Sequence, residues 1–168
     1  MLADFVNTTG DPVFDGALKQ ALSASLNQSP YLNVLPDERV VATLRLMGRS
    51  LEDRVTGRVA REVCERAGVK ALLAGSIAAV GTHFTIGLDA VNCSTGDTLA
   101  QEQVEAGSKE QVLGALGQAA SRMRRKLGES MASIEKSSRP MHEATTSSLE
   151  ALKAFSLGRE QQIGGRNR

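Results

Sequence analysis

The 168-residue chain is poor in aromatic residues and has no long apolar run. Aromatic residues make up 3% of the chain and tryptophan is absent, which argues against a surface that stacks nucleic-acid bases. The net charge of +1 gives no electrostatic reason to expect nucleic acid or an anionic membrane as a partner. No stretch approaches the roughly 20 apolar residues that cross a bilayer, and no basic-then-apolar leader is visible. We therefore expect no nucleic-acid partner and no membrane contact by this segment.

Cysteine and histidine are also scarce. Cys64 and Cys93 lie far apart without CxxC spacing, and we expect two partly buried free thiols. The two histidines, His83 and His142, are too few and too separated for a metal cluster of recognisable spacing. No serine lies in a Gly-x-Ser-x-Gly context. The residues therefore indicate no catalytic centre, no metal and no cofactor.

The N-terminal half alternates strand and helix patterns. Residues 2–6 are typical of a short strand, and Asp11-Pro12 suits the first positions of a helix as N-cap and first-turn proline. Residues 31–36 are predicted as a second strand, followed by two helices that end at Gly68. The helical spacing of apolar residues predicts which side chains face the core. They are Phe14, Leu18, Ala21, Leu22 and Leu26 in the first helix, Val40, Val41, Leu44 and Met47 in the second, and Val55, Val59 and Val63 in the third.

The pattern changes to period two after Gly68. Residues 69–80, 82–93 and 97–106 are predicted as three strands, separated by turn sequences of hairpin length. They should form an antiparallel meander. The last of them is polar enough to lie near an edge of the sheet.

The C-terminal part is predicted as helix, connector and helix. Ser108 and Gln111 have capping-box spacing before a long helix whose inward residues are Val112, Leu116, Ala120, Met123 and Leu127. The layout is β-α-β-α-α-β-β-β-α, an α/β domain with a mixed sheet of about five strands. We place that domain at residues 1–133, a polar connector at 134–146 and a separate helical segment at 147–168.

The loop at the end of the first strand is the candidate binding site. Asn7, Thr8, Thr9, Gly10 and Asp11 are typical of a tight strand-to-helix turn. Backbone N–H groups at such a helix start could bind an anion or a partner.

Two alternatives involve charged side chains. Asp4, Asp11 and Asp15 could form a metal-assisted, phosphate-handling enzyme site, although the phosphate-loop pattern Gly-x4-Gly-Lys-Ser/Thr is absent. A DNA-associated regulator is the other alternative. It would contact phosphates through the basic end of the long helix, namely Arg122, Arg124, Arg125 and Lys126.

Four blocks carry a resemblance to a known kind of module: DFVNTTGDPVFDGALKQAL, SPYLNVLPDERVVATLRLMGR, GSIAAVGTHFTIGLDAVNCSTGDTLAQEQVEA and ATTSSLEALKAFSLG. They resemble a bacterial accessory module, notably of acidobacteria. It lies between a serine/threonine kinase or winged-helix domain and a tetratricopeptide (TPR) array in multidomain signalling proteins. The layout is also similar to the N-terminal domain of TolB type. The resemblance implies a non-catalytic sensory or scaffolding module that binds a protein or small ligand. It also implies a position outside the cytoplasm, as part of a membrane-anchored bacterial protein, with a cytoplasmic position as the alternative.

The last segment resembles the first helix of a TPR. Leu157-Gly158 matches the Leu-Gly pair of that repeat. Leu149, Leu152 and Phe155 form an apolar stripe that half a repeat cannot bury by itself. We therefore expect these three residues to bind a protein partner, downstream TPR repeats or a second copy of the chain.

Overall fold

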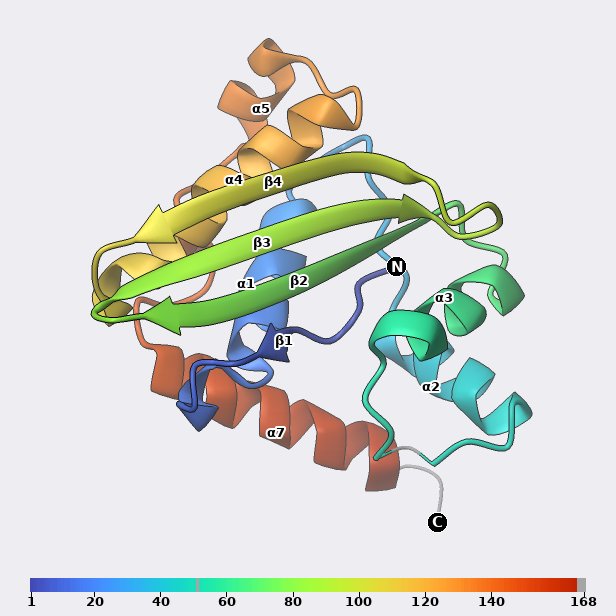
Figure 1. Cartoon of the computed structure of the whole chain (residues 1–168). Helices are drawn as coiled ribbons and strands as arrows, with labels where there is room; N and C mark the ends of the chain where they lie inside the picture. The colour runs from blue at the N-terminus through green and yellow to red at the C-terminus, as the bar shows by residue number, and fades with distance from the viewer. Residues whose placement is uncertain (51, 166–168) are drawn as a thin grey trace.

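The computed structural model describes residues 1–50 and 52–165 (Figure 1). It contains a four-stranded sheet in the order β1–β2–β3–β4. The strands are β1 (Val6–Asn7), β2 (Ala71–Val80), β3 (His83–Asn92) and β4 (Thr98–Ala106). β1 runs parallel to β2, and the other neighbours are antiparallel. The predicted mixed α/β class and the meander are confirmed.

Helices cover one face of this sheet and one end of it. α4 (Val112–Lys126) packs on β3 and β4, α1 (Ala17–Leu26) and α6 (Met141–Ala144) pack on α4 and on each other, and α7 (Leu149–Gly165) packs on α1. α2 (Asp37–Leu46) and α3 (Gly57–Arg66) lie beside the end of the sheet where β2 begins (Figure 1). α5 (Met131–Ser137) follows α4, and two short 3₁₀ turns, η1 (Pro12–Phe14) and η2 (Lys109–Gln111), precede α1 and α4. In the described residues, no helix is long and apolar enough to cross a membrane.

The main core forms on the helix-covered face, because alternate residues of a strand point to opposite faces. Ile86, Leu88 and Ala90 of β3 are buried there, while Thr85, Gly87 and Asp89 point away. The predicted inward residues of the first helical segment are all buried: Phe14, Leu18, Ala21, Leu22 and Leu26. In α4 the same holds for Val112, Leu116, Ala120 and Met123, with Leu127 partly buried at the rim.

A second, smaller core joins α2 and α3 to the sheet. It contains Leu72 of β2 and the side chains of Met1 and Ala3 from the N-terminal segment. Of the predicted inward residues, Val40, Leu44, Val55 and Val63 are buried in it, and Met47 and Val59 are partly buried against it. Val41 is partly exposed.

The predicted strand at 31–36 is wrong, which leaves four strands instead of about five. The Ser29 hydroxyl accepts hydrogen bonds from the backbone N–H groups of Tyr31 and Leu32 at 3.1 and 3.2 Å. This turn directs the segment over the surface of the core, and no strand pairs with it in the described part of the chain. Residues 2–6 run along β2, but only Leu2, in an isolated bridge to Leu73, and β1 pair with it.

The C-terminal segment packs on the domain. Residues 134–146 comprise the end of α5 and all of α6, and Ile134 and Met141 are buried. α7 lies against α1 and η1. Gly16, with φ 75°, lets α7 approach closely, because a Cβ at this position would overlap the Ser156 side chain.

A buried ion pair closes the end of α4. Arg124 and Glu129 are 1% and 4% exposed, and two parallel hydrogen bonds of 2.8 and 2.7 Å join their side chains. Ser29, Ser133, Ser137 and Ser138 supply further hydrogen bonds. The Arg124 guanidinium, helped by the Ser29 and Ser133 hydroxyls, lowers the pKa of Glu129 from 4.5 to about 2. The pair therefore fixes the loop after α1 against α4 and α5.

The depressed pKa of Glu129 predicts a loss of stability in acid. Its contribution of about 3 kcal/mol should be complete above about pH 5 and disappear as the pH falls towards 2, where the folded state takes up the proton. Urea denaturation from pH 6 to 2 measures this. Glu129→Gln should lower the unfolding free energy at pH 7 by about 3–5 kcal/mol and flatten the pH dependence. The control is Glu135→Gln, at an exposed position of α5; if it changes the profile as much, the assignment to Glu129 is wrong.

Gly75 of β2 provides a packing test. The Phe5 ring lies where a Gly75 Cβ would be, and Phe5 is 3% exposed. We expect Gly75→Ala to cost about 1–3 kcal/mol in denaturant unfolding, because the ring must move. Gly114→Ala on α4 is the matched control: no heavy atom lies within 4 Å of that Cβ, so the variant should be more stable by up to about 1 kcal/mol. Equal effects at both positions would contradict the packing at Phe5.

Candidate functional site

The Asn7–Asp11 loop is held by its own polar groups. The Asn7 carboxamide oxygen accepts hydrogen bonds from the Thr9 N–H and hydroxyl at 3.0 and 2.7 Å, and its NH₂ group donates to the Asp11 carbonyl at 2.9 Å. The N–H groups of Thr8 and Asp11 donate to the Ile77 carbonyl and the Thr9 hydroxyl. Three of the amides that the turn could offer to an anion are therefore already bonded. Ligand binding by this loop stays a prediction.

Asp11 caps the turn that follows, as the sequence predicts. Its carboxylate accepts the Val13 N–H at 2.9 Å, and its second oxygen lies 2.8 Å from Lys109 Nζ. The hydrogen bond from Lys109, followed by that from Val13, lowers the pKa of Asp11, and the same contact raises the pKa of Lys109. Both side chains are more than a third exposed, so this pair contributes little to stability.

The three aspartates do not converge on one site, and the metal-assisted enzyme hypothesis is wrong. Asp4 accepts a hydrogen bond from Lys19 at 2.8 Å and one from the Val55 N–H at 2.7 Å. Asp15 accepts a hydrogen bond from Asn7 on the other side of the loop. Within residues 1–50 and 52–165, no three His, Cys, Asp or Glu side chains are grouped to hold a metal ion. Each carboxylate instead stabilises a different junction of the backbone.

Three of the four cations that the DNA-binding hypothesis uses are paired with acidic residues, and within the described residues only Arg125 of the four stays outside an ion pair, so the structure does not support that hypothesis. Arg124 is buried against Glu129. Arg122 and Lys126 lie 3.9 and 2.8 Å from the Glu102 carboxylate, and that side chain is only 10% exposed. These cations are held by Glu102 and Glu129 and do not form a free phosphate-binding surface.

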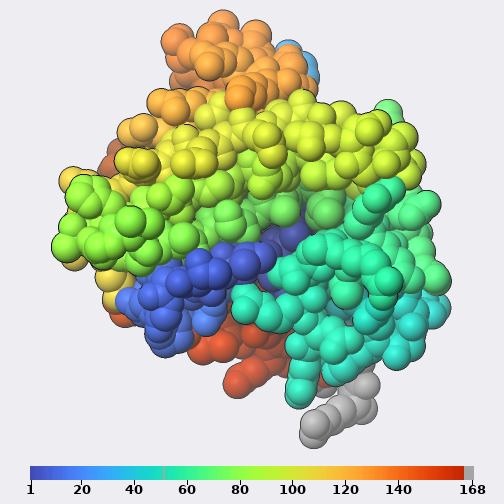
Figure 2. Space-filling view, viewed as in Figure 1, coloured from blue at the N-terminus to red at the C-terminus, as the bar shows by residue number. Residues whose placement is uncertain are grey.

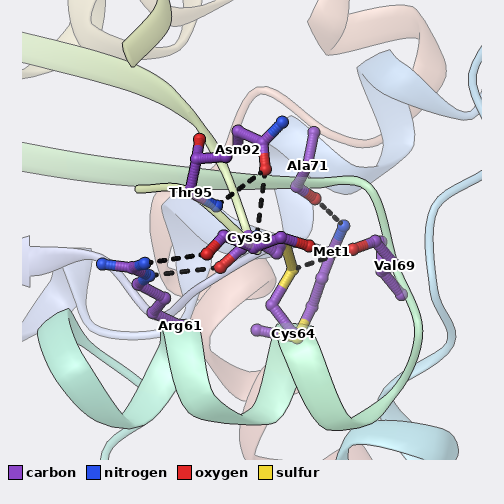
Figure 3. Close-up of a disulfide and its surroundings, with 9 residues drawn as sticks. Met1, Arg61, Cys64, Val69, Ala71, Asn92, Cys93 and Thr95 are labelled. Atoms are coloured by element: carbon purple, nitrogen blue, oxygen red, sulfur yellow. Dashed lines mark hydrogen bonds between the residues drawn. A yellow bond between two sulfur atoms is a disulfide. The ribbon is translucent and has the colours of Figure 1, made fainter. Parts of the chain in front are cut away.

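Cys64 and Cys93 form a disulfide, and the expectation of free thiols is wrong (Figure 3). Cys64 lies on the inward face of α3, Cys93 directly follows β3, and both are 0% exposed. Their Cα atoms are 5.7 Å apart, within the usual range for a disulfide. Arg61 of α3 reinforces the same junction with hydrogen bonds of 3.1 Å to the carbonyls of Cys93 and Ser94. The smaller core is thus covalently joined to the sheet.

The face of the sheet opposite the main core is largely uncovered. Figure 2 shows β2, β3 and β4 as adjacent green and yellow bands across this side of the molecule. Most side chains on it are small or polar, with Ser76, Ala78, Thr85 and Gly87 in the middle and Asp89 bonded to Gln101 at 2.7 Å; Val80, at the end of β2, is an exposed apolar exception. The prediction that residues 97–106 lie near an edge is confirmed, because β4 is the outermost strand.

A groove of about 1100 Å³ runs between β4, α4 and residues 138–147. Glu105 lies on the strand side, Arg139 and His142 on the opposite side, and Gly114 and Gly117 of α4 between them. The sequence indicated the edge strand but not this groove, because the path of residues 138–147 depends on the buried Arg124.

The C-terminal apolar stripe is divided between core and surface. Leu149 and Leu152 are 5% and 4% exposed and belong to the main core of this chain. Phe155 is 57% exposed. Leu149 and Leu152 therefore contact their own domain, while a partner at Phe155 stays a prediction.

Comparison with solved structures identifies proteins that share this architecture. The LpoB C-terminal domain from Salmonella enterica matches 62% of this chain and 78% of its own length, with a TM-score of 0.58 and 13% identity. The LpoB C-terminal domain from Escherichia coli matches with a TM-score of 0.58 and 14% identity, over 63% of this chain and 79% of its own. Lipoprotein GNA1162 from Neisseria meningitidis matches with a TM-score of 0.52 and 18% identity, over 77% and 96%. The chain shares their fold.

Comparisons of the sequence add no family. No family model matches the chain, and no curated protein matches it. The structures that share the fold are LpoB domains and a lipoprotein, so the predicted kinase–TPR accessory module and the TolB-type layout are wrong. The predicted role as a sensory or scaffolding module of a TPR-containing kinase-type protein is wrong for the same reason, because the structural neighbours are not proteins of that kind.

The disulfide gives a prediction about stability. It closes a loop with a sequence separation of 29, which corresponds to about 3.5 kcal/mol of chain entropy removed from the unfolded state. Reduction should therefore lower the unfolding free energy by about that amount in urea titrations. The Cys64→Ala/Cys93→Ala variant is the control and should not respond to reductant. Reaction of two thiols per unreduced, denatured chain with a thiol reagent would show that the bond is absent.

Proposed function

We propose that this chain is a domain of a bacterial cell-envelope protein of the lipoprotein kind, that it works outside the cytoplasm, and that it binds another protein. The observation that carries the proposal is the fold shared with the LpoB C-terminal domains and lipoprotein GNA1162. The likeness to GNA1162 extends over 96% of that lipoprotein, so the match is not limited to one supersecondary motif.

The disulfide supports the compartment. Bacterial disulfides persist mainly outside the cytoplasm, where the environment is oxidising. Cys64 and Cys93 are fully buried and hold the smaller core, which gives the bond a structural place in the domain. A domain that depends on this bond is suited to the envelope.

The surface supports protein binding over catalysis. The acidic residues that suggested an active site are each occupied by a separate partner: Lys19 for Asp4, Lys109 for Asp11 and Asn7 for Asp15. What the described surface offers is an uncovered sheet face with an open edge and an adjoining groove. Such surfaces accommodate polypeptide. We infer a binding domain with no catalytic role of its own.

Localisation and redox state test the proposal together. In cells that make the natural protein, the domain should sediment with the envelope, and protease should degrade it in spheroplasts but not in intact cells. Trapping of free thiols by alkylation during lysis should leave Cys64 and Cys93 unmodified. A cytoplasmic protein in the same cells is the control for leakage. Recovery of the domain in the cytoplasm with both thiols alkylated would overturn the proposal.

A further inference from the structure

The outer edge of β4 has a free stretch between two capped ends. In an antiparallel pair, the backbone groups of successive residues point alternately towards and away from the neighbouring strand. At the outer edge, the Gln101 carbonyl accepts a hydrogen bond from Lys126 Nζ, and the Gly107 N–H donates to the Gln111 side chain at 3.0 Å. Gln101, Gln103, Glu105 and Gly107 therefore face away from β3. The first and the last of these carry a side-chain cap.

Gln103 and Glu105 lie between the caps. Within the described residues, their outward N–H and C=O groups have no hydrogen-bond partner from this chain. Val104 between them pairs with Ile86 of β3, so the strand itself is firmly held. Four backbone groups in an extended, rigid arrangement are a template for one more strand.

The groove lies on the same side as this edge. Glu105 borders it, and α4 contributes Gly114, Gly117 and Ser121 to its surface. These small residues leave room for the side chains that an added strand would direct towards the helix layer. The volume of about 1100 Å³ is sufficient for several such side chains.

The carboxylate on the edge itself, Glu105, favours a basic residue beside it. Glu105 and Glu110 both line the groove and are exposed. Within residues 1–50 and 52–165, neither carboxylate takes part in an ion pair within 4.0 Å. Lys126 and Arg122, the nearest cations of α4, are bound to Glu102 instead. A lysine or arginine on an added strand would thus lie beside Glu105 at the edge of the sheet, whereas Glu110 is already hydrogen-bonded to Ser108, and Arg139 and His142 line the opposite side of the groove.

We propose that an extended segment of a partner protein adds to β4 as a fifth strand, bonded to the backbones of Gln103 and Glu105, with a lysine or arginine beside Glu105. This inference rests on the proposed function as a protein-binding domain. A single extended segment fits between the two caps. A second copy of the whole domain would also have to clear the end of α4 and α5, which lie beyond the edge of β4 in Figure 1.

Amide hydrogen exchange of the oxidised 168-residue chain tests the free state. The amides of Gln103 and Glu105 should exchange about 100-fold or more faster than that of Val104, which is bonded to β3. The rates should not change with protein concentration. Protection of Gln103 and Glu105 that increases with concentration would show a second copy on this edge and overturn the proposal.

The bound state is tested with a phage-displayed library of random nonapeptides selected on the same chain. Selected peptides should contain lysine or arginine and should protect the amides of Gln103 and Glu105. N-methylation at alternate peptide positions should weaken binding about tenfold or more, and at the intervening positions have little effect, because only every second amide faces β4. Recovery of no binding peptide, or of peptides that leave both amides unprotected, would overturn the proposal.

A matched pair of variants separates backbone from side chain. Gln103→Pro removes an outward N–H and leaves the ladder to β3 intact, a position where an edge strand tolerates proline. It should weaken peptide binding about tenfold or more, whereas Gln103→Ala, which keeps the N–H, should bind like the parent. Glu105→Lys should weaken binding of basic peptides further. If the natural partner still crosslinks to Gln103→Pro as it does to the parent, the edge proposal fails while protein binding stands; if no protein partner is found at all, the proposed function itself fails.

Discussion

The two-residue alternation of the central hairpin, β2 and β3, is the constraint on which the rest of the structure depends. On one face it presents Ile77, Ile86 and Leu88 to α1 and α4, and on the other it presents mostly small and polar side chains between Leu72 and Val80. Because this period is strict, a residue cannot serve both faces. The layer formed by α1, α4, α6 and α7 therefore covers one face. Towards its start, β2 also contributes Leu72 on the opposite face, and there α2 and α3 pack as a second core.

Polar links also join these two cores. Lys19 of α1 lies between Asp4 and Asp37, at 2.8 and 3.5 Å, and Arg159 of α7 reaches Asp37 and Glu38 at 3.9 and 3.5 Å. Together with the Cys64–Cys93 bond, these contacts connect the N-terminal segment, α2, α3 and α7. Burial opposes the positive charge of Lys19, and the carboxylates of Asp4 and Asp37 favour it. The net result is a raised pKa for Lys19. The ammonium is thus retained as a structural cation.

The sequence predicted local structure where one period was uninterrupted. The meander, the first apolar helix and α4 were recovered because their patterns extend over nine or more residues and have a single explanation. The strand at 31–36 failed because strand propensity without a neighbouring edge is not sufficient; Ser29 turns the chain away instead. The disulfide and the buried Arg124 depend on contacts between distant segments. The pairing of Cys64 with Cys93 could be predicted only after α3 had been placed beside the end of β3. Arg124 could not be recognised as buried, because its sequence context is that of an ordinary basic helix end.

The low identity to the structural neighbours has a physical reading. At 13–18% identity, the positions that keep a fold are the buried ones, and any apolar side chain of suitable volume satisfies them. Exposed positions are free to change under that constraint, and a partner is recognised by exposed positions. Backbone groups are the exception, since an outward N–H or C=O at a sheet edge is present whatever side chain the residue bears. A binding mode that uses the backbone at the edge of β4 would therefore persist when the side chains around it change. Specificity for one partner would then depend on Glu105 and the side chains next to it.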